Sequence, residues 1–495
     1  MTLLTTVSTN KYVTAEMSKN KPSVIVSFVP IAVLVLLLYA VIRAFGSDSL
    51  EGGSQVSLLA ASAVCVAIAM LRYGVKWQTL EDAISKNIYS VGSAIIMLLL
   101  IGAIAGSWMV SGVVPSLICY GLEIMHPKLF LVSSCVISAI VSIMTGSSWT
   151  TIATIGVALI GIGQAQGFDE GWIAGAIISG AYFGDKISPL SDTTVLASSS
   201  AETPLFTHIR YMMITTVPSF SIALIVFTIV GFTHEISDPA QIAAFSASLR
   251  ETFNITPWLL IVPLFTLLLI IRKLPALITL FASCLLAGIF LCVFQPEILY
   301  NISGSEGFMG AFRGVMQSYY GATAIETGNE ALNELVATNG MAGMLHTVWL
   351  IVCAMCFGGV MAGSGMLANI TAFFLRFVRR TVSIVASTVG AGIFCNMCTG
   401  DQYLSIILSS NLFKELYRKQ GLEPRLLSRS VEDSATVCSV LIPWNSCGMT
   451  QSTVLGVSTF VYFPYCIFNL ISPVMSITVA AIGYKIIKKQ PEATE

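Results

Sequence analysis

The sequence predicts an all-α polytopic membrane protein with about ten transmembrane helices plus two hairpins. Three observations support this fold class: an apolar composition, runs long enough to cross a bilayer, and an internal repeat. Of the 495 residues, 55% are hydrophobic and 10% are charged, and the mean hydropathy is +0.83, which is typical of a chain whose main partner is the lipid bilayer. The formal net charge of -1, with no basic tail, argues against nucleic-acid binding.

Apolar windows of ~20 residues, each long enough to span the hydrocarbon core, locate the crossings. Two further stretches, 128–164 and 382–418, are apolar but interrupted at MTGSSWTT and CTGDQYLS. This pattern favours re-entrant hairpins whose non-helical tips are buried in protein, and two full spans for each stretch remain an alternative. The predicted crossings are residues 23–45, 53–73, 89–111, 172–200, 211–232, 257–273, 275–294, 346–366, 426–455 and 457–483.

The distribution of basic residues predicts the orientation. With the N-terminus in the cytoplasm, four of the 25 lysines and arginines fall outside and Lys186 falls within the membrane, while all the others face inward. We therefore expect a multi-pass protein of the cell (inner) membrane with both termini in the cytoplasm. The predicted segments are cytoplasmic tails at 1–22 and 484–495, repeats at 23–232 and 257–483, and an external connection at 233–256.

An internal repeat relates the two halves of the chain. Sliding the sequence against itself by 254 residues aligns MTGSSW (144–149) with CTGDQY (398–403), and the same offset brings Pro189 onto Pro443. Each half has five predicted crossings, an odd number, so the two halves must lie upside down relative to one another. Inverted repeats with broken helices are typical of secondary transporters, which bind their substrate near the midplane where the repeats meet. We expect the tips TGSS and TGDQ to face each other there.

The stretch SGAYFGDKISPLSDTT, residues 179–194, places charges around a proline inside a hydrophobic segment. Pro189 lacks a backbone donor and clashes with the preceding turn, so the helix is expected to break at 188–192. Pro443 is expected to break the matching helix at LIPWNSCG. Broken helices free carbonyl oxygens inside the membrane, and such carbonyls coordinate cations in transporters. The sequence therefore predicts a cation site at these breaks.

An intramembrane carboxylate is a functional candidate because it costs ~3 kcal/mol or more to insert. We expect Asp192 to be the main ligand for a cation and for protons, with Asp185 holding the broken helix or supplying a second charge. Lys186 either balances charge or snorkels to the interface, and a purely structural ion pair among these three residues is the alternative. Glu432 is expected at a solvated helix start. Further candidate ligands at the tips and breaks are Ser188, Ser191, Thr193, Thr194, Thr145, Ser147, Thr399, Asp401 and Asn445.

The segment GDKISPLSDTT (184–194) resembles the NhaC family of sodium/proton antiporters, as do TGDQYL (399–404), SRSVEDSATV (428–437) and LIPWNSCG (441–448). The resemblance covers roughly residues 25–480. It implies Na⁺ and H⁺ as transported ions, no cofactor, and sodium binding at Asp185 and Asp192. The family is similar in architecture to the ion transporter superfamily, which implies an elevator-like transport domain beside a scaffold that forms a homodimer. The family motif falls on Gly184, Asp185, Ser188, Pro189, Ser191, Asp192, Thr193 and Thr194, all present here.

The sequence leaves the transported solute open. Sodium/proton antiport by alternating access, with one carboxylate shared by sodium and protons, is the first hypothesis. The family also includes exchangers that resemble sodium/lactate and malate antiporters, and Val195 stands where many relatives have asparagine. Exchange of a small organic acid or amine is therefore the rival, with contacts from Trp149, Gln402, Tyr403, Trp444 and Asn445.

An enzyme is not expected, because no G-x-S-x-G elbow or nearby histidine accompanies the intramembrane serines. A channel is a third possibility.

Overall fold

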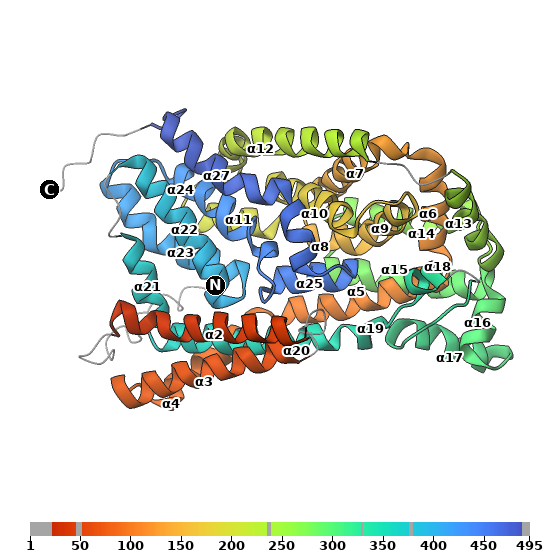
Figure 1. The fold of residues 1–495 in the computed structure, drawn as a ribbon, viewed down its shortest axis with the longest axis horizontal. Coiled ribbons are helices and arrows are strands. Elements are labelled where there is room, and N and C mark those ends of the chain that lie inside the picture. The colour runs from red at the N-terminus through yellow and green to blue at the C-terminus, as the bar shows by residue number, and fades with distance from the viewer. Residues whose placement is uncertain (1–21, 46–51, 235–238, 328–329, 376–379, 488–495) are drawn as a thin grey trace, which may run out of the picture.

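The computed structural model describes residues 22–45, 52–234, 239–327, 330–375 and 380–487 (Figure 1). Within these ranges, nine helices are long and apolar enough to cross a membrane, and two more helix pairs qualify if each bent pair counts as one span. The bends are 91° between Thr252 and Pro257 and 55° between Tyr465 and Ile467. The protein is therefore an all-α polytopic membrane protein.

The first half contains both predicted devices, a hairpin and a helix broken near a proline. The hairpin arms are separated by Gly146 and Ser147, and the broken helix is interrupted at 188–191. Its helices are α2 (Val24–Phe45), α3 (Gly53–Tyr73), α4 (Trp77–Ser90), α5 (Gly92–Val110), α6 (Val113–Ile124), the hairpin α7 (Phe130–Thr145) with α8 (Ser148–Thr151), η3 (Ile152–Gly156) and α9 (Val157–Ala165), the broken helix α10 (Glu170–Ile187) with α11 (Asp192–Ser200), and α12 (Leu205–Thr233).

The second half repeats this order. The hairpin is α22 (Thr381–Thr399) with α23 (Gln402–Lys419), and the broken helix runs through α24 (Pro424–Val431), the π-helical η6 (Glu432–Thr436), η7 (Ser439–Leu441) and α25 (Ser446–Leu455). The remaining helices are η4 (Pro257–Leu260), α14 (Ile261–Ile271), α15 (Ala276–Phe294), α20 (Leu345–Gly363), α21 (Met366–Phe374), α26 (Thr459–Tyr462), η8 (Phe463–Tyr465) and α27 (Ile467–Ile482).

The connections contain helices that the hydropathy pattern did not predict. Residues 233–256 include α13 (Pro239–Thr252), and residues 295–345 include α16 (Pro296–Ser303), α17 (Gly307–Tyr320), α18 (Glu330–Val336) and α19 (Gly340–Gly343). These helices are short or polar, so a search for apolar windows passes over them. In Figure 1, α13, α16 and α17 gather at the right-hand end of the molecule.

The two hairpin tips have the same hydrogen bonds. Thr145 Oγ1 donates to the carbonyl of Ser147 at 3.1 Å, and Thr399 Oγ1 donates to the carbonyl of Asp401 at 3.0 Å. Each threonine hydroxyl also pairs with the hydroxyl six residues further on, at 3.1 and 3.0 Å. The glycine after each threonine is left-handed, with φ of +69° and +66°, a conformation that glycine adopts readily. The offset of 254 residues therefore relates two copies of one structural unit.

The two halves run in opposite directions. The helix α5 corresponds to α20 in the repeat, and each is followed directly by a shorter helix, α6 or α21. In Figure 1, α6 lies at the right-hand end of the molecule and α21 at the left-hand end. The matched helices α5 and α20 therefore point opposite ways, as the odd number of crossings predicts.

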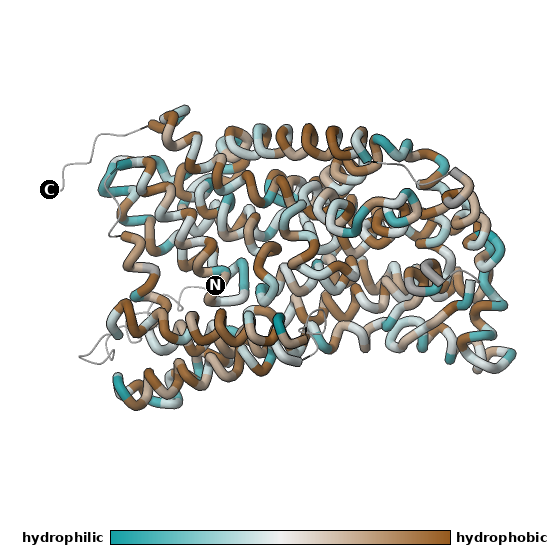
Figure 2. Tube along the Cα trace, viewed as in Figure 1, coloured by the Kyte–Doolittle hydropathy of each residue, from teal (hydrophilic) through white to brown (hydrophobic). Residues whose placement is uncertain are grey.

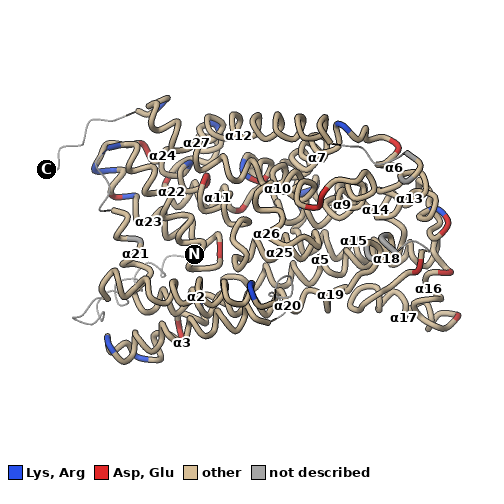
Figure 3. Tube along the Cα trace, viewed as in Figure 1, with Lys and Arg blue, Asp and Glu red and all other residues tan. Residues whose placement is uncertain are grey.

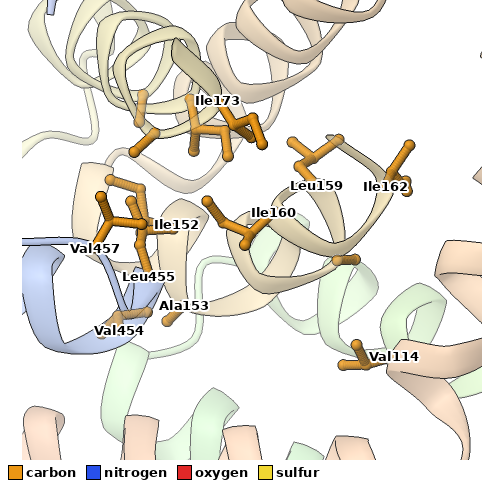
Figure 4. Packing of buried hydrophobic residues seen from close by; sticks show 14 of the residues in the cluster. Val114, Ile152, Ala153, Leu159, Ile160, Ile162, Ile173, Val454, Leu455 and Val457 are labelled. Carbon is orange, nitrogen blue, oxygen red and sulfur yellow. The ribbon is translucent and has the colours of Figure 1, made fainter. Parts of the chain in front are cut away.

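The halves are intertwined rather than side by side. The helices α3 and α4 of the first half pack on α20 of the second, and α15 and α17 of the second half pack on α5 of the first. We call these six helices, with α2 and α14, the scaffold layer. The hairpins and broken helices form the other part of the molecule, in which α11 packs on α23 and α25 packs on η3. Figure 4 shows Val454 and Leu455 of the second half beside Ile152 and Ala153 of the first.

Polar and charged residues gather at the two ends of the molecule, while the length of the helices between them is largely apolar (Figure 2). Figure 3 shows the same separation for charge, with acidic residues also present around α10 and α11 in the interior. Because charged groups are costly inside a bilayer, these interior residues need a specific explanation.

Close packing of α7 on α10 should depend on Gly180. A Cβ atom at this position would lie 2.0 Å from the carbonyl oxygen of Cys135, a backbone atom that cannot move aside cheaply. Gly180→Ala should therefore lower the melting temperature of the detergent-solubilised protein, at a cost of about 1–3 kcal/mol. The control is Gly92→Ala, because a Cβ at Gly92 meets nothing within 4 Å. Equal melting temperatures for the two variants would contradict this packing account.

Candidate functional site

The first helix break is held by hydroxyl groups around Pro189. Ser188 Oγ donates to the carbonyl of Ile143 in the hairpin at 2.8 Å. Thr194 Oγ1 donates to the carbonyl of Lys186 at 3.1 Å, and Ser191 Oγ accepts from the Thr194 amide at 3.3 Å. The predicted break is present, and part of the backbone that it frees is bonded to side chains. Ser188, Ser191 and Thr194 thus hold the break itself.

The second break is held by the second hairpin tip. The amide of Ser446, which begins α25, donates to the carbonyl of Gly400 at 2.8 Å. Asn445 caps α25, since its Oδ1 accepts from the Cys447 amide at 3.0 Å. At the first tip, a Cβ on Gly146 would lie 2.7 Å from the backbone of Leu190. Each tip therefore contacts the break of its own half.

A cavity of about 450 Å³ lies between the first tip and break, the start of α23, and the scaffold layer. The scaffold contributes residues from the turn between α4 and α5 and from the turn between α14 and α15, among them Lys273. The polar and aromatic side chains that face the cavity from the other part of the molecule are Thr145, Ser147, Trp149, Thr150, Asp185, Asp192, Gln402 and Tyr403. Both predicted aspartates therefore reach one cavity.

Asp185 is buried, with 5% of its surface exposed. Its Oδ2 accepts from both the amide and the hydroxyl of Ser148, at 3.0 and 2.7 Å. The other oxygen, Oδ1, has no hydrogen-bond partner among the described residues. Since a buried carboxylate oxygen normally has a partner, Oδ1 is available to a proton or a cation in the cavity.

Asp192 is exposed to the cavity and begins α11. Its Oδ2 accepts from the hydroxyl of Tyr403 at 2.7 Å, and its Oδ1 accepts from the amide of Thr193 at 2.9 Å. The N-terminus of a helix favours a negative charge. Because Tyr403 belongs to the second half, Asp192 joins the two repeats at the edge of the cavity.

The remaining predicted ligands of the second half do not reach this cavity. Asp401 is buried and caps α23, accepting from the Leu404 amide at 2.8 Å. Asn445 donates to the side chain of Asn396 at 3.2 Å, and the indole of Trp444 donates to the carbonyl of Met397 at 2.8 Å. The first-half subsite therefore places its carboxylates in the cavity. Asp401 of the second half lies outside the cavity lining, and its Oδ2 has no hydrogen-bond partner among the described residues.

Two charged residues lie in surroundings that the sequence did not indicate. Lys186 forms an ion pair with Asp433 rather than with the aspartates beside it in sequence, and it does not line the cavity. The expectation of a solvated helix start at Glu432 is wrong, because this residue is fully buried. Polar residue types suggested exposure there, but packing against α22, α23 and α27 encloses the turn. Glu432 also lies in a π-helical turn, a feature often found at functional sites, which the sequence pattern did not predict.

A surface ion pair ties the first broken helix to the second hairpin. Glu202, in the turn after α11, pairs with Lys414 and lies 3.7 Å from Arg418, both on α23. The hydrogen bond from Lys414 lowers the pKa of the exposed Glu202 carboxyl. Screening by water makes the energetic contribution of such a pair small, so it marks where α11 lies beside α23 but adds little to their packing.

Comparison with known proteins places these features in context. The model of the Na+/H+ antiporter family matches residues 3–201 and 180–484. The chain is 36% identical to the Na(+)/H(+) antiporter NhaC of Bacillus subtilis (strain 168), over 85% of this chain and 91% of that protein. It is also 36% identical to the Malate-2H(+)/Na(+)-lactate antiporter of the same organism, over 85% of this chain and 86% of that protein. It is 31% identical to the arginine/ornithine antiporter ArcD of Halobacterium salinarum, over 96% of this chain and 95% of that protein.

The different surroundings of the aspartates give a test of the site geometry. A water-soluble thiol reagent should modify Asp192→Cys at least ~10-fold faster than Asp401→Cys, because reaction requires access to the thiolate. Mass spectrometry of individual peptides separates the new cysteine from the native ones. Equal protection of both positions would show that Asp192 does not face an open cavity.

Proposed function

This chain belongs to the Na⁺/H⁺ antiporter family, and we propose that it exchanges sodium ions for protons at one pair of carboxylates, Asp185 and Asp192. It is an antiporter and a multi-pass membrane protein, not an enzyme. The observation that carries the proposal is the cavity that both carboxylates reach, where the first tip, the first break and the second hairpin meet. Competition between Na⁺ and H⁺ for the same carboxylates suffices for antiport.

The two aspartates have different roles in this proposal. Asp192 is reached by water and is held by Tyr403, so it meets ions first and is the main ligand. Asp185 is anchored by Ser148 and offers its unpartnered Oδ1 as a second ligand. A nearby cation favours the charged form of a carboxyl, whereas burial favours the neutral form. Sodium binding therefore removes a proton, and protonation releases sodium.

The position of the cavity suggests how access alternates. Its lining includes Lys273, and Arg272 precedes this residue in the same turn, so the positive-inside rule supports an opening toward the cytoplasm. We place both termini on the same side, in the cell membrane. The cavity lies where the scaffold layer meets the part that carries the carboxylates. We propose that this part moves past a dimeric scaffold in an elevator-like step, which carries the carboxylates to the other face.

Removal of each charge provides the test. In proteoliposomes, Asp192→Asn should reduce sodium-dependent dissipation of a pH gradient to background, because the amide neither titrates nor supplies a charge. Asp185→Asn should slow exchange by roughly 10–100-fold, the range for loss of a supporting group at a metal site. Asp169→Asn, an exposed aspartate before the same helix, is the matched control and should exchange at the wild-type rate.

The opposite pattern is equally informative. Exchange by Asp192→Asn near the wild-type rate, with an unchanged pH profile, would refute the assignment of the main ligand. If Asp185→Asn abolishes exchange in a well-folded protein while Asp192→Asn only slows it, the two roles are reversed.

A second candidate function is supported by the size of the cavity. About 450 Å³ exceeds what one ion needs and lies within the ~300–1,000 Å³ typical of small-molecule sites. Trp149, Gln402 and Tyr403 line it, whereas Trp444 and Asn445 do not. A small organic acid or amine could be exchanged there, as the names of two relatives indicate for those proteins. Uptake of a labelled solute driven by a sodium gradient, without sodium-dependent pH dissipation, would favour this function over the first.

A further inference from the structure

A group of buried charges lies away from the cavity, between α10 of the first half and the π-helical turn η6 of the second. Lys186, Glu432 and Asp433 are each fully buried. Lys186 Nζ forms an ion pair with Asp433 Oδ1 and donates to Ser472 Oγ at 3.2 Å. Thr215 and Ser472 also donate to Asp433 Oδ1, at 3.3 and 3.2 Å. We call Lys186, Glu432 and Asp433 the buried triad.

The carboxylate oxygens of the triad are incompletely bonded. Both oxygens of Glu432 and Oδ2 of Asp433 have no hydrogen-bond partner among the described residues. An ionised carboxylate buried without a partner costs several kcal/mol, so such a group is normally neutral or bound to a cation. Glu432 therefore has the surroundings of a protonated carboxylic acid.

The charge balance around Glu432 leads to the same conclusion. Asp433 follows Glu432 in η6 and pairs with Lys186, and Asp185 precedes Lys186 on α10, so one lysine lies among three acidic side chains. Arg429, one turn earlier, is also buried, but its guanidinium lies over the ring of Tyr211 at 4.9 Å and makes no hydrogen bond with Glu432. Since Lys186 neutralises Asp433, Glu432 needs a proton unless another cation is near.

Neighbouring residues of α10 connect the triad to the cavity. Asp185 faces the cavity, whereas the next residue, Lys186, pairs with Asp433. A cation that binds at Asp185 supplies the missing positive charge near Glu432, and it therefore favours loss of the proton from Glu432. Ionised Glu432 in turn favours cation binding, because coupling between two sites is reciprocal.

We propose that Glu432, with Asp433 and Lys186, forms a second proton-binding site, and that a sodium ion in the cavity drives its proton off. This inference rests on the proposed function, because it takes the cavity as the sodium site. The step is balanced: one Na⁺ adds a positive charge at Asp185, and the O–H bond of Glu432 breaks to release one H⁺. Together with the proton displaced from the cavity carboxylates, more than one proton leaves for each sodium ion bound.

Other titratable groups lie on the elements packed against η6, and variants at Glu432 leave all of them unchanged. The described residues of α27 include no charged group. The groups on the other elements are Asp192 on α11, Cys395 and Cys398 on α22, Tyr403, Tyr417 and the charges from Lys414 to Lys419 on α23, and Arg425 and Arg429 on α24.

The experiment measures the affinity for sodium against pH, using radioactive Na⁺ and the purified full-length protein. The slope of log Kd for sodium against pH gives the number of protons displaced. Glu432→Gln imitates the protonated acid permanently. The slope is negative, because sodium binds more tightly at higher pH, and its magnitude should be smaller than in the wild type by about one. Glu415→Gln, with its side chain 64% exposed on α23, is the matched control and should keep the wild-type slope.

A second variant changes the triad in the opposite direction. Asp433→Asn leaves Lys186 to pair with Glu432, which then stays ionised and no longer exchanges a proton. The magnitude of the slope should therefore also fall by about one. A folded variant of either kind with the wild-type slope would overturn the second site.

The wild-type protein gives a test that needs no variant. Sodium added to weakly buffered protein should release more than one proton per ion bound, and release of no more than one would refute the second site. The proposed function fails separately, if Asp185→Asn and Asp192→Asn both bind sodium as tightly as the wild type.

Discussion

Every backbone amide and carbonyl inside a bilayer needs a partner within the protein, and this constraint explains the centre of the molecule. Two helices are interrupted, before and after Pro189 and Pro443, and each interruption leaves backbone groups unpaired. The hairpin tips and nearby hydroxyls supply the partners, as in the bonds of Ser188 to the first hairpin and of Ser446 to the second. The polar interior therefore results from the need to hydrogen-bond the backbone groups freed at the breaks, and the carboxylates lie within it.

The repeat provides two similar frameworks, but the charges on them differ. The tips share their threonine hydrogen bonds and left-handed glycines, yet Asp185 and Asp192 correspond to Ser439 and Ser446 at the same offset. The second half carries its acids instead at Glu432 and Asp433, which meet Lys186 of the first half. One framework thus opens on a cavity, while Asp433 of the other is paired internally with a lysine across the interface between the halves.

Sequence reasoning succeeded where a residue type has a fixed local consequence. Pro189 and Pro443 stand beside polar residues in apolar segments, which predicted both breaks, whereas Pro30, Pro218 and Pro473 lie inside continuous helices. The repeat of TG motifs predicted two equivalent tips. It failed where the outcome depends on partners distant in sequence. Lys186 pairs with Asp433, and the burial of Glu432 comes from helices that pack around a polar turn. The sequence predicts Asp192 as a ligand, but its exposure to a cavity and its bond to Tyr403 required the structure.

The central claim is that sodium binds at the carboxylates of Asp185 and Asp192. The most direct measurement is an experimental structure of the protein saturated with sodium at alkaline pH, compared with one at acidic pH without sodium. This account predicts ion density within coordination distance of Oδ1 of Asp185 and a carboxylate oxygen of Asp192 in the first structure, and none in the second. Sodium density at a different place, with these oxygens bonded only to protein, would contradict it.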